Sequence, residues 1–188
     1  GRFFSTPVKR VRGGAGQEVV EQPNLDALPI LTCWPGDGGR FITLPQVITY
    51  DPRTGKRNMG MYRMHVFDRA TTGMHWQIQK GGGFHYTVAE RRGEPLELAV
   101  AIGTDPALLL ATIAALPENI DEAMFAGFLR GSRTEFTRGR SIGIDVPAQA
   151  EFILEGVVPP HERRMEGPFG DHFGHYSNAA EFPVFHLK

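Results

Sequence analysis

The sequence has little cysteine, no long apolar run and almost no net charge, and each of these excludes a class of protein. The single cysteine, Cys33, cannot form a disulfide within the chain, so we expect a reducing compartment, the cytoplasm. No apolar stretch approaches the roughly 20 residues of a membrane-spanning helix. The 20 basic and 21 acidic residues leave a net charge of −1, which argues against a nucleic acid or an anionic membrane as partner.

Complete nucleotide-binding fingerprints are also missing. Three glycine-rich stretches, "RGGAG", "PGDGG" and "KGGG", could approach a phosphate through backbone N–H groups. None of them fits the Walker or the dinucleotide pattern in full, so this signal for a phosphate site is weak. With one cysteine beside seven histidines, a structural zinc site has little support.

The order of strand and helix signals predicts one α+β domain. We expect an extended lead-in over residues 1–29 and a single domain over residues 30–188. β-Branched runs between turn signals predict strands, and capped apolar runs predict helices. The expected strands are 46–51, 57–68, 73–79, 96–103, 134–138, 141–146, 148–158 and 182–187, and the expected helices are 84–93, 105–116 and 121–131. Many strands with a few packed helices favour a barrel-like antiparallel sheet.

Polar residues in apolar surroundings are the first candidates for chemistry. Asn58 and Arg63 stand five positions apart in one expected strand. Asn58 could offer an amide oxygen and Glu122 a carboxylate, and such hard oxygen ligands suit Mg or Mn. The simpler alternative for Glu122 is a charge in the first turn of a helix, where the helix dipole favours it.

The stretch "EGPFGD" places two carboxylates, Glu166 and Asp171, around a Gly-Pro-Phe-Gly turn. Such a turn can bring the two side chains together. Close carboxylates disturb each other's pKa, so one of them would stay protonated near neutral pH and act as an acid. The alternative is an ordinary solvated turn.

Five longer motifs, taken together, resemble a known family. In order along the chain they are "LPILTCWPGDGGRFITLPQVITYDPRTGKRNMGMYRMHV", "TGMHWQIQKGG", "VAIGTDPALLLA", "VPAQAEFILEG" and "EGPFGDHFGHY". They closely resemble the UbiD family of prenylated-FMN-dependent decarboxylases, from about residue 16 to the end of the chain.

The resemblance implies a fold, a reaction and a set of cofactors. The implied fold is an antiparallel split β-barrel of the flavin reductase-like FMN-binding type, with a few packed helices. The implied cofactors are prenylated FMN, Mn²⁺ or Mg²⁺, and K⁺. The implied reaction is the reversible, non-oxidative decarboxylation of an α,β-unsaturated or (hetero)aromatic carboxylic acid. The protein would thus be a carboxy-lyase acting on a small molecule.

The resemblance also assigns roles to residues. The implied metal ligands are Asn58, Glu122 and Gln79, the last at a position where many relatives carry His. Arg63 would hold the substrate carboxylate, Glu166 would orient Arg63, and Asp171 would deliver the proton. The implied cofactor-binding residues are Asn58, Met61, Tyr62, Arg63, His75, Trp76, Gln77, Gln79, Lys80, Gly81 and Glu122.

Members of this family are longer than this chain, which leaves other possibilities open. The resemblance implies absent parts before and after it, and hence a homo-oligomer or a hetero-oligomer with a partner that carries the C-terminal domain. The alternative function is a non-catalytic flavin-binding or assembly subunit that needs such a partner. A third possibility is a flavin reductase-like domain that uses ordinary FMN.

Overall fold

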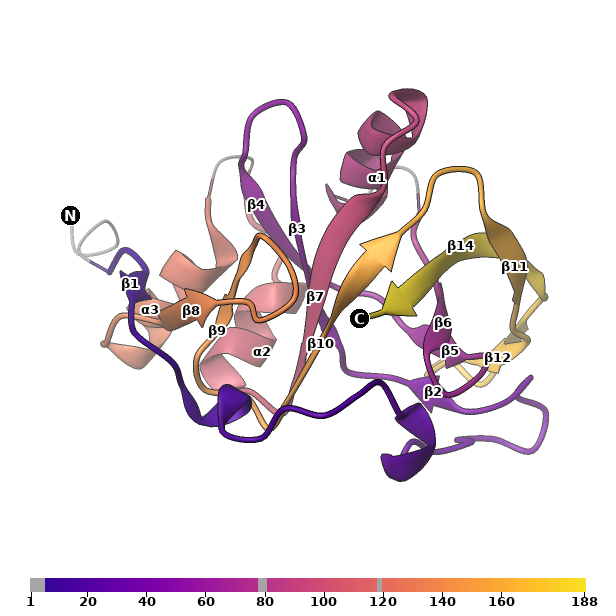
Figure 1. Ribbon diagram of the computed structural model, residues 1–188. Coiled ribbons are helices and arrows are strands. Elements are labelled where there is room, and N and C mark those ends of the chain that lie inside the picture. Colours follow the sequence, from indigo (N-terminus) through magenta and orange to yellow (C-terminus); the bar gives the residue numbers. More distant parts are fainter. Residues whose placement is uncertain (1–5, 78–80, 118–119) are drawn as a thin grey trace.

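The computed structural model describes residues 6–77, 81–117 and 120–188, and its centre is one curved antiparallel sheet (Figure 1). Within these ranges nine strands belong to the sheet. Their order is β2 (Phe41–Ile42), β5 (Met64–Val66), β6 (Thr71–Met74), β14 (Ala180–Leu187), β10 (Phe152–Val158), β7 (Leu96–Ile102), β3 (Gln46–Tyr50) and β4 (Arg57–Met61), with β11 (Arg163–Glu166) paired to β14. The predicted α+β class with a barrel-like antiparallel sheet is confirmed.

The expected strands 46–51 and 57–68 pair as the hairpin of β3 and β4, but the second strand is shorter than expected. Ile48 pairs with Met59 and Thr49 with Asn58. The expected strand 57–68 ends at Met61 and resumes as β5, because β5 pairs with β2 and β6 instead of β3. Arg63 therefore lies in the break between two strands and not inside one.

The predicted strand 73–79 is also wrong at its end. β6 stops at Met74, and the three following residues have no regular structure. Helix α1 (Gly81–Arg91) then begins three residues before the predicted start. Glycine is a poor helix former, but a Cβ added at Gly82 would lie 2.8 Å from Trp76 Nε1 and 3.1 Å from Tyr62 Cε2. Close packing thus favours glycine in this first turn.

Helices α2 (Pro106–Ile113) and α3 (Glu122–Arg130) begin one residue after the predicted starts, Asp105 and Asp121, which are their N-caps. The Asp105 carboxylate accepts hydrogen bonds from the backbone N–H groups of Ala107 (3.0 Å) and Leu108 (3.2 Å). Asp121 caps α3 in the same way, and Gly131 ends it in the left-handed conformation, at φ 76°. The cap of α3 fixes where Glu122 stands.

The core has two parts, one on each face of β7. Leu98 and Val100 point into the curved sheet, where the buried cluster includes Met64, Met74 and Phe185. Ala99 and Ala101 point the other way, where the cluster includes Ile48, Leu108 and Phe136. This alternation is the period of two expected for a strand, here buried on both faces. Helices α2 and α3 cover the second cluster (Figure 1).

The expected lead-in contacts the rest of the fold at several places. β1 (Lys9–Arg10) runs parallel to β8 (Glu135–Arg138), which pairs with β9 (Asp145–Pro147). Short 3₁₀ helices follow at Ala15–Gln17 and Leu25–Ala27, and Leu25 is wholly buried.

No strand was expected between residues 158 and 182, but this stretch contains β11 and a small hairpin. The hairpin strands are β12 (Phe169–Gly170) and β13 (Tyr176–Ser177). No helix in the described part of the chain is long and apolar enough to cross a membrane.

Candidate functional site

The Glu166 side chain is the centre of a buried polar cluster. It is 0% exposed and lies at the end of β11. Its Oε1 accepts a hydrogen bond from Arg63 Nε at 2.8 Å, and its Oε2 accepts one from Arg63 Nη2 at 3.0 Å. His75 Nδ1 lies 3.1 Å from the same Oε2. The predicted contact between Arg63 and Glu166 is therefore present, with His75 as a third member.

Two opposing effects act on the pKa of Glu166. Burial raises it, but the hydrogen bonds from His75 and Arg63 outweigh burial and lower the pKa to about 2. Glu166 is therefore a fixed negative charge at neutral pH, and its charge is matched by the Arg63 guanidinium.

The hairpin of β12 and β13 holds Arg63 from the side. The guanidinium carbon of Arg63 lies 4.7 Å from the centre of the Phe169 ring, and Nη2 donates to Ser177 Oγ at 3.0 Å. Nε and Nη2 are thus occupied, while Nη1 makes no hydrogen bond to another described residue. Nη1 therefore remains as a donor for a carboxylate.

Asp171 lies elsewhere, in the turn of that hairpin. Its Oδ1 accepts hydrogen bonds from the backbone N–H groups of Phe173 (2.9 Å) and His175 (3.1 Å). These bonds hold the pKa of Asp171 below its usual range. Of the two interpretations of this turn, the structure favours the ordinary turn, because Glu166 and Asp171 have different hydrogen-bond partners that both favour the charged form.

A second cluster surrounds the start of α1. Tyr62 Oη accepts a hydrogen bond from the Gly82 backbone N–H at 3.2 Å and lies 3.4 Å from Asn58 Nδ2. The Asn58 amide fills the space beside Gly81, where a Cβ would overlap Oδ1. Trp76 is 6% exposed, and its Nε1 is buried with no hydrogen-bond partner in the described structure. An unpaired donor beside a helix N-terminus suits an anionic group.

Glu122, in the first turn of α3, contacts the backbone of β4. Its Oε2 accepts a hydrogen bond from the Met59 backbone N–H at 3.3 Å, next to Asn58 in the chain. Burial raises the pKa of Glu122 to about 7. The neighbouring Asp121 does not lower the pKa of Glu122, because Asp121 is a carboxylate too and is paired with Arg57 at 2.6 Å. A nearby cation would lower this pKa, so the site fits a metal ligand.

The remaining predicted residues are less informative. Met61 is half-buried at the end of β4, and Gln77 is exposed. Gln79 and Lys80 lie outside the described residues. Within those residues, no three His, Cys, Asp or Glu side chains form a possible metal site. The predicted metal set contains only one such residue, so this absence does not bear on it.

Sequence reasoning missed three contacts of this site. Phe169 and Ser177 flank Arg63, and His75 bonds to Glu166 where only a cofactor contact was expected. Phe169 and Ser177 follow Glu166 in the sequence, but no sequence pattern identifies them as contacts of Arg63.

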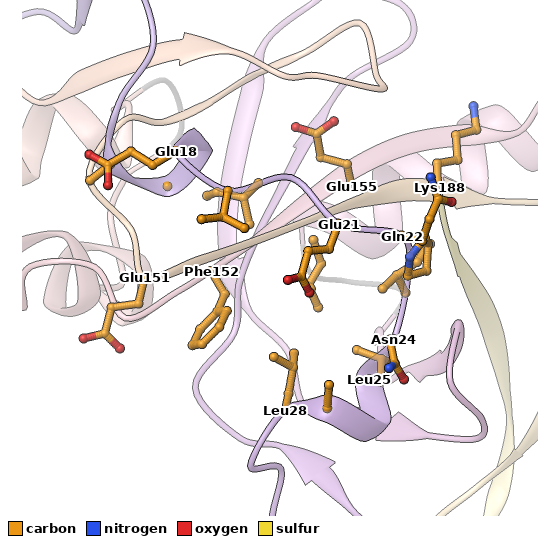
Figure 2. A pocket seen from close by; sticks show the side chains of 18 residues that line it. Glu18, Glu21, Gln22, Asn24, Leu25, Leu28, Glu151, Phe152, Glu155 and Lys188 are labelled. Atoms are coloured by element: carbon orange, nitrogen blue, oxygen red, sulfur yellow. The ribbon is translucent and has the colours of Figure 1, made fainter.

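A groove of about 400 Å³ lies apart from both clusters. Its walls are the segment from Ala15 to Leu28, the start of β10 and the last two residues of the chain. Phe152, Leu28 and Glu21 lie around its opening (Figure 2). None of the predicted site residues lines it.

The fold and the known relatives define the class of protein. Nitrilotriacetate monooxygenase component B from Bacillus cereus shares the fold at 16% identity and a TM-score of 0.50, over 90% of this chain and 80% of that one. The fold is therefore the predicted split barrel of the flavin reductase-like FMN-binding type. Residues 8–188 match the UbiD family, described as the 3-octaprenyl-4-hydroxybenzoate carboxy-lyase Rift-related domain, and the chain belongs to this family.

Relatives and solved structures agree with this assignment. An uncharacterized protein of Archaeoglobus fulgidus is 54% identical over 98% of this chain and 38% of its own length. A Chlamydia pneumoniae protein, named as one of the subunits of a 4-hydroxybenzoate decarboxylase, is 48% identical over 87% of this chain and 28% of its own. The UbiD-class enzyme HmfF from Pelotomaculum thermopropionicum, solved with FMN, matches at 33% identity and a TM-score of 0.92, over 99% of this chain and 44% of that one. Sedimentibacter hydroxybenzoicus vanillic acid decarboxylase in closed form matches at 28% identity and a TM-score of 0.92, over 99% of this chain and 42% of that one.

An evolved dimeric form of HmfF is described in complex with prFMN. The chain spans about 40% of the length of these solved relatives. It spans 38% of the length of the Archaeoglobus protein and 28% of the length of the Chlamydia protein.

Proposed function

We propose that this chain is the prenylated-FMN-binding domain of a decarboxylase that removes CO₂ from an α,β-unsaturated or (hetero)aromatic carboxylic acid. The observation that carries the proposal is the Arg63 guanidinium. Its Nε and Nη2 are bound to a wholly buried carboxylate and to Ser177, and its Nη1 makes no hydrogen bond to another described residue. A guanidinium fixed in this way can donate a charge-assisted hydrogen bond from Nη1 to a substrate carboxylate.

In this proposal each residue has a separate task. Arg63 binds and orients the substrate carboxylate, and Glu166 keeps Arg63 in place. Because its pKa is about 2, Glu166 is charged and does not donate a proton. Asp171 delivers the proton, for which its carboxylate must leave the N–H groups of Phe173 and His175 that now favour its charged form. Prenylated FMN, when bound, would supply the electron sink for the loss of CO₂.

The cluster at the start of α1 would hold the phosphate end of the cofactor. Trp76 Nε1 and the backbone N–H groups of the first turn are donors for an anion. Asn58 and Glu122 would hold Mn²⁺ or Mg²⁺ beside it, and their hard oxygen donors fit such an ion. Gln79 as a third ligand, Lys80 as a cofactor contact and K⁺ near the phosphate remain parts of the proposal that rest on the family resemblance.

A second function is favoured by the length of the relatives. Because the chain spans 38% of the Archaeoglobus protein, further domains or a partner subunit would complete the active site. The chain would then bind flavin without turning over substrate alone, in a homo-oligomer or a hetero-oligomer. Its exposed Cys33 agrees with the reducing, cytoplasmic location expected from the sequence.

The test is to produce the chain together with a flavin prenyltransferase, in the presence of Mn²⁺ and K⁺. The absorbance spectrum and the mass of the released ligand report which flavin is retained. Retained prenylated FMN would support the proposal, whereas NAD(P)H oxidation with unmodified FMN would support a reductase. A folded protein that binds neither flavin would contradict the cofactor site. CO₂ release by the loaded chain, alone or with added partner domains, separates the enzyme from the assembly subunit.

A further inference from the structure

The Arg63–Glu166 pair alone does not fix the direction of the Arg63 fork. Two hydrogen bonds of 2.8 and 3.0 Å hold the two side chains to each other. Ser177 and Phe169 contact the pair on its Arg63 side. A contact on the Glu166 side is needed as well if Nη1 of Arg63 is to point in one direction.

His75 supplies this outside contact and is itself held at three points. Its Nδ1 lies 3.1 Å from Glu166 Oε2, and its backbone N–H donates to the Arg63 carbonyl at 3.3 Å. Its ring packs on Phe182, with the ring centres 4.3 Å apart. His75 therefore touches the backbone of one member of the pair and the side chain of the other.

The charge on Glu166 fixes which nitrogen of His75 carries a proton. An ionised carboxylate only accepts hydrogen bonds. Nδ1 must therefore be the donor, whether or not Nε2 is protonated as well. The hydrogen bond is charge-assisted, which is the stronger kind.

We propose that His75 is a positioning residue, which holds the Glu166 carboxylate through its Nδ1–H so that Nη1 of Arg63 points in one direction. This role differs from the cofactor contact that the family resemblance implies for His75. The use of Nη1 for a substrate carboxylate rests on the proposed function, but the arrangement of the three side chains does not.

Two substitutions separate the hydrogen bond from the ring packing. His75→Asn places an amide N–H near the position of Nδ1 but removes the ring. His75→Phe keeps an aromatic ring against Phe182 but removes the donor. His186→Phe is the matched control, because His186 forms a similar pair with Glu162, at 2.9 Å, among partly exposed side chains.

Nitrogen-15 NMR of the whole chain tests the arrangement without substrate or cofactor. We expect a proton on Nδ1 of His75 and a protected Arg63 Nε–H signal, which weakens in His75→Phe and persists in His75→Asn and His186→Phe. An unprotonated Nδ1 in the wild-type protein would overturn the proposal. So would an Arg63 signal that survives His75→Phe and is lost in His75→Asn.

Binding of benzoate, as a carboxylate probe, then tests the consequence. We expect about tenfold weaker binding by His75→Phe than by His75→Asn, since one hydrogen bond to a charged group is lost. Equal affinities for these two variants would contradict the positioning role. Failure of the wild-type chain to bind benzoate would count against Arg63 as the carboxylate site, while the NMR result still decides the role of His75.

Discussion

Replacing Glu166 with Gln should cost this fold about 3 kcal/mol of stability at neutral pH. The pKa of Glu166 is about 2, against an ordinary value of 4.5. At 1.36 kcal/mol per pKa unit, this difference corresponds to about 3.4 kcal/mol. Leaving one partner of a buried ion pair alone typically costs about 3–5 kcal/mol, which is the same range. Glutamine has nearly the same shape, so the loss reports the charge and not a cavity.

The sign of the pH dependence follows from the direction of the shift. Folding lowers the pKa of Glu166, so its stabilisation is complete above about pH 4.5 and is lost as the pH falls toward about 2. Urea unfolding at about pH 7 should show the full difference between wild type and Glu166→Gln. By about pH 3 the difference should have narrowed by about 2 kcal/mol.

Glu155→Gln is the matched control for this experiment. Glu155 is also buried, but its carboxylate accepts hydrogen bonds from the Arg140 N–H (2.8 Å) and the Ser141 hydroxyl (2.8 Å), which carry no formal charge. We expect its substitution to cost about 1–2 kcal/mol. Equal losses for the two variants, or a loss below about 1 kcal/mol for Glu166→Gln, would refute the argument that a fixed charge pair is the main contribution of Glu166.

Three further changes test other parts of the site. Glu122→Gln should raise the free energy of unfolding of the metal-free protein by up to about 2 kcal/mol at about pH 8 and change it little at about pH 4. The reason is that the cost of the buried charge of Glu122 grows as the pH rises toward its pKa of about 7. Urea unfolding measures this difference, and a difference that stays constant across this pH range would contradict the prediction. Gly82→Ala should lower stability by about 1–3 kcal/mol, since the new methyl group would crowd Trp76 and Tyr62; a gain, as for alanine in an open helix, would show that the packing relaxes. Asp171→Asn in the cofactor-loaded holoenzyme should abolish CO₂ release while prenylated FMN stays bound, and full activity would reject its role as proton donor.

Local signals in the sequence were enough for the helices and the hairpin. Asp105 and Gly131 occupy the capping positions predicted for them, because a cap depends on only a few neighbouring residues. The hairpin of β3 and β4 likewise follows from its alternation and turn residues. The start of α1 could not be predicted from local signals. Its first turn, Gly81–Gly83, packs against Trp76 and Tyr62, which lie outside the helix.

The site was predicted residue by residue but not in its geometry. The resemblance placed Arg63 next to Glu166, and the structure has both in contact. It did not indicate that Asp171 would turn away, because that depends on two backbone N–H groups within its own turn. The contact of His75 with Glu166 depends on the packing of β6 beside β14 and β11, which no local pattern records.

The break after β4 links the two clusters of the site. Asn58, beside the α1 N-terminus, and Arg63, beside Glu166, are five positions apart, so the backbone between them spans at most roughly 16 Å. If the chain had continued as one strand through Arg63, that side chain would have followed the alternation of β4. Because β4 ends at Met61 and β5 pairs with different strands, Arg63 is free to turn to Glu166 on β11.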